Sequence, residues 1–140
     1  MSEKNSISVV EADEYDRSFL NLHPDIAVIS ALDADHLDIY GNKNYMMESF
    51  TLFAKQIRKK GILFLKTGLK LTDNKIKSKS YSAKIKSDFW ADDIFVKDSV
   101  FYFTLNFPGN KKINIKAGVP GFHNVENAVA AAAVACETGV

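Results

Sequence analysis

The stretch Ser8–Gly41, SVVEADEYDRSFLNLHPDIAVISALDADHLDIYG, decides how the rest of this 140-residue chain is interpreted. Two short apolar runs, Ile7–Val10 and Ile26–Ile29, each lead into a cluster of acidic residues. Short runs rich in β-branched residues, with no polar alternation after Ser8, are typical of strands buried on both faces of a parallel sheet. Because open α/β sheets bind ligands at the carboxyl ends of their strands, the two acidic clusters are candidate functional segments.

The two clusters combine carboxylates with one imidazole. Their members are Glu11, Asp13, Glu14, Asp16, Asp33, Asp35, His36 and Asp38. Carboxylate oxygens with little counter-charge nearby suit a hard divalent cation such as Mg²⁺. The alternative is that these acids are solvated loop residues or helix N-caps, which are also common after strands. His23, which precedes a proline, is interpreted as structural.

The pattern downstream predicts a helix and then a third buried strand. Apolar residues recur at the spacing of one helix face between Asn44 and Arg58, and Gly61 is expected at the C′ position of that helix. The third strand is expected at Ile62–Leu65. Strands that alternate with helical segments predict a parallel sheet with right-handed crossovers.

After Gly68 apolar and polar residues alternate, which is typical of strands with one solvated face and antiparallel pairing. The alternating runs are Tyr81–Lys86, Val100–Phe107 and Lys112–Lys116, with Asp92–Lys97 as a further candidate strand. We therefore expect an inserted antiparallel sub-sheet at residues 78–117. A final helix is expected at Asn124–Thr138, capped by Gly139.

Charge and composition limit the possible partners. The net charge is +1, which gives no general argument for nucleic-acid binding. Residues 55–86 do carry eleven basic residues against one acid, but the lysines of residues 75–86 alternate with other residues, and no platform of aromatic residues for stacking bases interleaves with them. We interpret this segment as a solvated face, and a basic interaction surface is the alternative.

The single cysteine, Cys136, excludes a disulfide within the chain and is expected to be a small buried hydrophobe. No apolar run has the length of a membrane span, and the N-terminus lacks a signal-peptide pattern, so the cytoplasm is the default compartment. The chain stops one residue after Gly139, and we expect it to be a piece of a longer protein.

Three motifs resemble the central ATP-binding domain of the Mur ligases, a family of peptidoglycan-precursor enzymes. They are VVEADEYDRSF, DADHLDIYG and, at Val119–Ala135, VPGFHNVENAVAAAAVA, and they occur in the family's order. The resemblance covers essentially residues 1–140. It implies an α/β fold, part of a P-loop-NTPase-like parallel sheet with helices, to which the small antiparallel sheet is added before the last helix.

Within the family, the resemblance is strongest to the branch that joins L-alanine to UDP-N-acetylmuramate through an acyl phosphate, with ATP and Mg²⁺. The murein-peptide recycling branch is the alternative. The resemblance implies that Glu11 and His36 are catalytic and ligate the Mg²⁺ ion that bridges the ATP γ-phosphate and the substrate carboxylate. It also implies that Asn127 pairs with adenine while His123 or Asn124 flanks the ring. Alternatively, Asn124 is the N-cap of the last helix and Asn127 serves the same helix terminus.

This sequence departs from the family pattern in three ways. The glycine-rich phosphate loop that ends in Gly-Lys-Thr/Ser is absent, and so is the domain that binds the amino acid. Ser30-Ala31-Leu32 stands where many members have an asparagine. We therefore expect the chain alone to be inactive, and a homodimer of it is possible. From a different class, a non-catalytic nucleotide- or metal-binding module is the alternative.

Overall fold

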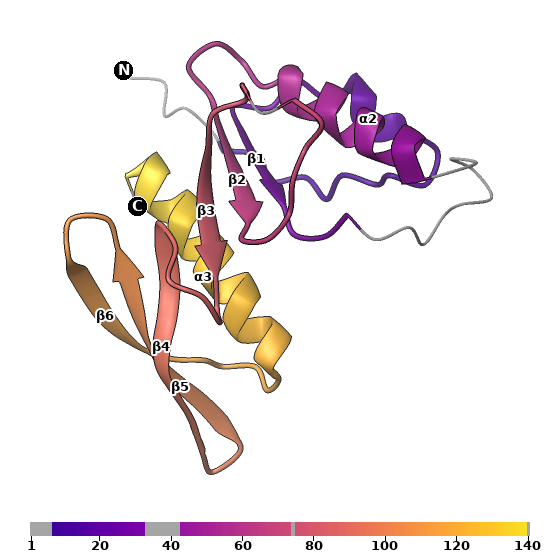
Figure 1. Cartoon of the computed structure of the whole chain (residues 1–140). Coiled ribbons are helices and arrows are strands. Elements are labelled where there is room, and N and C mark those ends of the chain that lie inside the picture. Colours follow the sequence, from indigo (N-terminus) through magenta and orange to yellow (C-terminus); the bar gives the residue numbers. More distant parts are fainter. Residues whose placement is uncertain (1–6, 33–42, 74, 140) are drawn as a thin grey trace, which may run out of the picture.

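One six-stranded mixed sheet organises the chain (Figure 1). The computed structural model describes residues 7–32, 43–73 and 75–139. The strands are β1 (Ile26–Ile29), β2 (Ile62–Lys66), β3 (Ser78–Ser82), β4 (Phe89–Lys97), β5 (Val100–Phe107) and β6 (Lys111–Lys116), and their spatial order equals their order in the sequence. The ladders from β1 to β4 are parallel, and β5 pairs antiparallel with both β4 and β6. The predicted α/β class, with an antiparallel part before the last helix, is confirmed.

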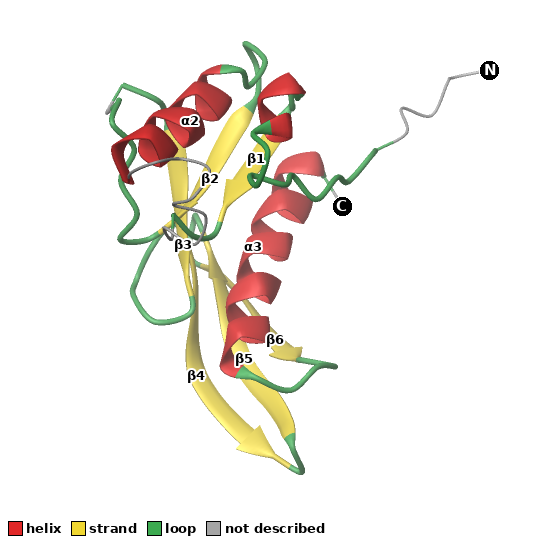
Figure 2. Ribbon diagram, turned by 90° about the vertical axis from the view of Figure 1, so that its right-hand side faces the viewer, coloured by secondary structure: helices red, strands yellow, loops and turns green. Residues whose placement is uncertain are grey.

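Two helices cover opposite faces of the sheet (Figure 2). The helix α2 (Lys43–Lys55) packs Phe53 and Ala54 on β1, together with the short 3-10 helix η1 (Ser18–Asn21). The helix α3 (Phe122–Thr138) packs its stripe of small residues on the other face, over β2 to β5. That second core contains Phe64, Tyr81, Ala83, Phe89, Ala91, Phe103, Leu105, Val125, Val129, Ala130 and Ala133.

The predicted buried strand at Ile7–Val10 is wrong. This segment has no regular secondary structure, and Val9 is 93% exposed. In the described residues β1 is the edge strand, so the segment has neither a ladder partner nor a covering helix. A β-branched run favours a strand only where such neighbours exist.

Gly61 is not the C′ residue of the preceding helix, because α2 ends at Lys55. It lies in the turn before β2, where a Cβ atom would be 2.3 Å from the carbonyl oxygen of Asp25 and 2.5 Å from Cγ2 of Ile57. The glycine is needed here for close approach of the backbone rather than for helix capping.

The predicted strand Tyr81–Lys86 is shifted, because β3 ends at Ser82. The hydroxyl of Ser82 accepts hydrogen bonds from the N–H groups of Lys84 and Ile85, which turns the chain toward β4. Since β3 pairs in parallel with both β2 and β4, antiparallel pairing begins at β4 rather than at residue 78.

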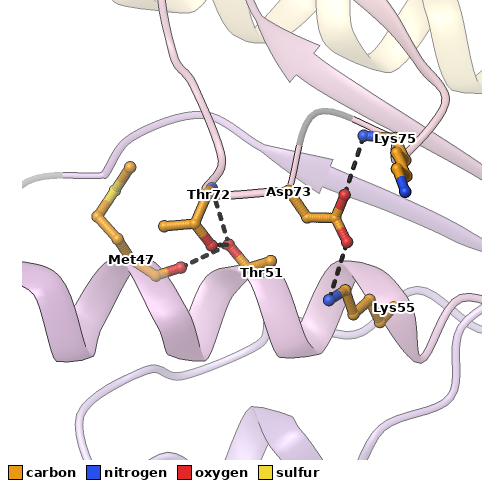
Figure 3. Close-up of polar contacts among 6 residues, drawn as sticks. All are labelled: Met47, Thr51, Lys55, Thr72, Asp73 and Lys75. Atoms are coloured by element: carbon orange, nitrogen blue, oxygen red, sulfur yellow. Dashed lines mark hydrogen bonds and ion pairs between the residues drawn. The ribbon is translucent and has the colours of Figure 1, made fainter.

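The segment between β2 and β3 is fastened to α2 by polar contacts (Figure 3). The Thr51 hydroxyl accepts hydrogen bonds from the N–H and hydroxyl of Thr72, and it donates to the carbonyl oxygen of Met47. The Lys55 ammonium lies 2.9 Å from the carboxylate of Asp73 and lowers the pKa of that group. The described residues of the connection between the parallel strands β2 and β3 form no helix, and these polar contacts hold the connection against α2 instead.

Cys136 is exposed, contrary to the prediction. The buried stripe of α3 ends at Ala133, so the next turn of the helix extends past the core. Gly139 has a left-handed backbone (φ 78°) and caps the helix as predicted.

Candidate functional site

The carboxyl ends of β2 and β3 meet the first turns of α3, and this is the edge where α/β sheets bind ligands. Lys66, the last residue of β2, stands opposite Tyr81 of β3 in the ladder. The carboxylate of Glu126, on α3, lies 2.7 Å from the Lys66 ammonium, and its negative charge also acts on Tyr81. The hydroxyls of Thr67 and Ser87 lie 2.6 Å apart at the same edge.

The start of α3 carries three of the predicted site residues. His123 and Asn127 are exposed and stand four positions apart on one helix face, so both side chains can reach a single ligand. The loop before the helix orients the first of them. Gly121 has φ 108°, and a Cβ atom there would lie 2.6 Å from Cε1 of His123. The imidazole therefore packs directly against a bare backbone.

Asn124 is not the N-cap of α3, and its role beside a nucleotide base stays a prediction. The N-cap is Gly121, which offers no side-chain hydrogen bond, so the prediction that Asn124 caps the helix is wrong. The side-chain amide of Asn124 donates to the carbonyl oxygen of Pro120, 2.6 Å away. This contact fixes the loop, and it occupies one of the donors that a base would need.

Aromatic and basic side chains also gather at this end of α3. The Lys84 ammonium, from the β3–β4 connection, lies 5.3 Å from the ring centroid of Phe122. Phe122 is 36% exposed and precedes His123 directly. A flat ring with a cation beside it can favour an aromatic or anionic ligand.

Glu11 lies in an exposed segment without regular secondary structure. Its proposed partner, His36, falls outside the described residues, as do Asp33, Asp35 and Asp38. Among residues 7–32, 43–73 and 75–139, no three His, Cys, Asp or Glu side chains come together as a metal centre would require. The Mg²⁺ assignment to Glu11 and His36 therefore stays a prediction.

Two other acids of the first cluster accept hydrogen bonds from nearby backbone N–H groups. The carboxylate of Asp13 accepts a hydrogen bond from the N–H of Tyr15, and that of Asp16 accepts one from the N–H of Ser18. The hydrogen bonds from Ser18 lower the pKa of Asp16. These contacts match the alternative interpretation of the cluster as a turn that leads into η1.

Lys66, Tyr81 and Glu126 were not predicted from the sequence as site residues. Two signals point to them in retrospect: a charged residue that ends the buried run ILFLK, and an acid three positions after His123, on its face of the helix. The Tyr81 hydroxyl beneath them is buried and has no hydrogen-bond partner. Burial, together with the negative charge of Glu126, raises the pKa of Tyr81 to about 12.

We expect Tyr81→Phe to raise the free energy of unfolding by about 1 kcal/mol at neutral pH, because it removes a buried and unpartnered hydroxyl. The pKa of Tyr81 in the folded chain lies above the ordinary value of 10, so folding disfavours the charged phenolate. The unmodified chain therefore keeps its full stability below pH 10 and loses part of it as the pH rises toward about 12. Urea unfolding between pH 7 and 12 should therefore show a steeper alkaline decline for the unmodified chain than for Tyr81→Phe. Tyr102→Phe, at a half-buried ring, is the control. Parallel pH curves for the unmodified chain and Tyr81→Phe would contradict the expectation.

An open groove of about 490 Å³ lies elsewhere, on the antiparallel part of the sheet. Its wall includes Phe95 and Tyr102, whose rings stack with centroids 5.2 Å apart. Of the predicted site residues that the structure describes, none lines this groove. Within the described ranges, neither helix has the length and apolar character needed to cross a membrane.

A mixed sheet whose first four strands are parallel, with helices on both faces and polar side chains at the carboxyl ends of β2 and β3, defines an α/β domain of the ligand-binding type. The family model for the Mur ligase middle domain matches residues 1–135, and the chain belongs to that family.

The relatives agree with this assignment. A UDP-N-acetylmuramate--L-alanine ligase from Christiangramia forsetii is 42% identical over 135 residues, which are 96% of this chain and 29% of that protein. The chain thus spans less than a third of the curated relative. The crystal structure of a UDP-N-acetylmuramate-alanine ligase from Thermotoga maritima has a TM-score of 0.77 at 23% identity and covers 92% of this chain and 29% of its own. A Neisseria meningitides structure titled as a UDP-N-acetylmuramate:L-alanyl-gamma-D-glutamyl-meso-diaminopimelate ligase also has a TM-score of 0.77 at 23% identity, with coverage of 99% and 46%.

Proposed function

We propose that this chain is part of an ATP-dependent ligase that joins L-alanine to UDP-N-acetylmuramate in peptidoglycan-precursor synthesis, in the cytoplasm. The observation that carries the proposal is the 42% identity to an enzyme of that name over 96% of the chain. The murein-peptide recycling ligase is the alternative, since a structure of that kind has the same TM-score as the alanine ligase. The sequence identity favours the alanine ligase, because fold similarity alone does not separate the two.

In this proposal the start of α3 holds the adenine side of the nucleotide. The side-chain amide of Asn127 is exposed and can pair with adenine through one donor and one acceptor. The imidazole of His123 flanks the ring from the same helix face, where Gly121 leaves room for it. The amide of Asn124 keeps the loop in place through the Pro120 carbonyl.

Glu11 and His36 are the proposed Mg²⁺ ligands. The chemistry of Glu11 fits, because its carboxylate is exposed on the segment that follows Ile7–Val10. A bound Mg²⁺ would offset negative charge where a phosphate and a carboxylate approach each other. With no glycine-rich phosphate loop in the sequence, we expect no ATP turnover by this chain alone.

The test is calorimetric titration of the chain with ADP and with GDP in the presence of Mg²⁺. We expect weak binding with a preference for ADP, and we expect Asn127→Ala to weaken ADP binding about 10-fold and to remove the preference, since an amide–adenine pair is worth about 1–3 kcal/mol. Asn114→Ala, on the exposed strand β6, is the matched control and should leave both affinities unchanged. Equal affinities for ADP and GDP in the unmodified chain would refute the adenine assignment.

A further inference from the structure

We infer that Lys66 is an anion-binding residue for the phosphates of the nucleotide, and that Glu126 holds and neutralises it in the ligand-free chain. The inference rests on the proposed function, because it concerns the same nucleotide. It adds two residues to which no role has been assigned so far: Lys66 lies outside the three motifs, and Glu126 lies within Val119–Ala135 beside the residues proposed to hold adenine.

The two charges form a pair at a defined position. The Lys66 ammonium is 2.7 Å from a carboxylate oxygen of Glu126, and the two side chains are 35% and 17% exposed. Lys66 ends a parallel strand, on the face that α3 covers, beside the buried ring of Tyr81. A lysine at this edge is reachable from solvent, but its charge is largely offset by the carboxylate beside it.

The pair lies next to the residues proposed to hold adenine. Glu126 is three positions after His123 and one before Asn127, on the helix face that these residues share. In the sheet, β2 lies between β1 and β3, so Lys66 stands between the start of α3 and the carboxyl end of β1. A nucleotide with its base on α3 and its phosphates directed toward β1 would pass this lysine.

The charges of Lys66 and Glu126 determine whether a substitution strengthens or weakens phosphate binding. A phosphate that approaches Lys66 must compete with Glu126 for the same ammonium, and it is also repelled by the carboxylate. Neutralising Glu126 removes both penalties and leaves the cation free. Neutralising Lys66 instead leaves a half-buried negative charge facing the phosphates. The two substitutions should therefore have opposite effects on anion binding.

The chain offers a matched control at the other end of the same helix. Lys79 and Glu137 form an ion pair of the same length, 2.7 Å, with side chains 39% and 37% exposed. This pair joins β3 to the last turns of α3, more than two helical turns from Glu126. Substitutions there change the net charge equally without altering the proposed site.

The experiment titrates four proteins with inorganic pyrophosphate, ADP and adenosine by calorimetry: the unmodified chain, Glu126→Gln, Lys66→Met and Glu137→Gln. We expect Glu126→Gln to bind pyrophosphate and ADP about 3- to 10-fold more tightly, as the loss of one nearby charge predicts. Lys66→Met should bind both more weakly by a similar factor. Adenosine, which has no phosphate, should bind all four proteins equally, and the gain in Glu126→Gln should shrink at high salt.

Two results would overturn the inference. One is that Glu126→Gln and Glu137→Gln bind pyrophosphate alike; the other is that neither the unmodified chain nor Glu126→Gln binds it at all. Failure of the proposed function gives a different pattern. Glu126→Gln would still raise the affinity for pyrophosphate, but the unmodified chain would bind ADP and GDP with equal affinity. A preference for ADP that depends on Asn127, without any effect of Glu126→Gln, would keep the nucleotide site and remove Lys66 from it. Unchanged circular dichroism of each variant shows that the fold is intact.

Discussion

Replacing Gly61 with alanine is expected to lower the free energy of unfolding by about 3 kcal/mol, which is at the upper end for an overpacked site. The added Cβ atom would lie 2.3 Å from the carbonyl oxygen of Asp25 and 3.0 Å from that of Arg58. Both are backbone atoms, so no side-chain rotation can relieve the overlap. The Asp25 carbonyl also accepts a hydrogen bond from the N–H of Ile62, where the β1–β2 ladder begins. Moving it therefore disturbs the edge of the sheet.

Urea denaturation followed by circular dichroism measures this effect. Gly118→Ala is the matched control, because no atom lies within 4 Å of the position of its Cβ and its backbone does not require glycine. We expect the control to change stability by less than about 0.5 kcal/mol. A Gly61→Ala variant as stable as Gly118→Ala would show that the turn before β2 can relax around a methyl group.

Phe89→Ala is expected to cost about 3–5 kcal/mol, the usual range for the loss of a buried aromatic ring. Phe89 opens β4 and is 1% exposed. Its ring meets Phe64 and Phe107 edge-on, with centroids 5.7 Å and 5.9 Å away. The residue joins the parallel part of the sheet to the antiparallel part, so the cavity would lie at their junction. Since small domains are stable by only about 5–15 kcal/mol, a large part of the total would be lost.

Phe95→Ala is the comparison for this second prediction. Phe95 lies on the same strand, but it is 54% exposed and stacks on Tyr102 at the surface. Its loss should cost less than about 1 kcal/mol. Similar midpoints in urea for the two variants would contradict the assignment of Phe89 to the core.

The elements that the sequence predicted correctly are those whose pattern is local. The spacing of Met46, Phe53 and Ala54 defines the buried face of α2 without reference to other segments. The alternation in Val100–Phe107 predicts β5 with the same bounds that the structure has. Ile7–Val10 has an equally good local pattern, but its state depends on neighbours that the described residues do not provide. The expected strand Tyr81–Lys86 was wrong beyond Ser82, because the side chains of Ser82 and Asp88 bind backbone N–H groups and direct the chain from β3 into β4.

The candidate site was predictable to a smaller extent. The motif predicted His123 and Asn127 as site residues, and both are exposed on one face of α3, but their role toward adenine stays a prediction. The ion pair between Lys66 and Glu126 joins residues 60 positions apart, and only the register of β2 against β3 and the course of α3 bring them together. No pattern in either segment alone encodes that contact. Glu11 and His36 remain predictions, since the second lies outside the described residues.

The linear order of the strands, with α3 following all of them, determines when the larger core can close during synthesis. Each strand pairs with its neighbour in the sequence, so the ladders can form in turn as the chain emerges. Phe64, Phe89 and Phe103 nevertheless face the position of α3, which is synthesised after all six strands. This apolar face of the sheet stays exposed to solvent until α3 covers it with Val125, Val129 and Ala133. A nascent chain that stalls before residue 122 would therefore expose it to chaperones or to other chains.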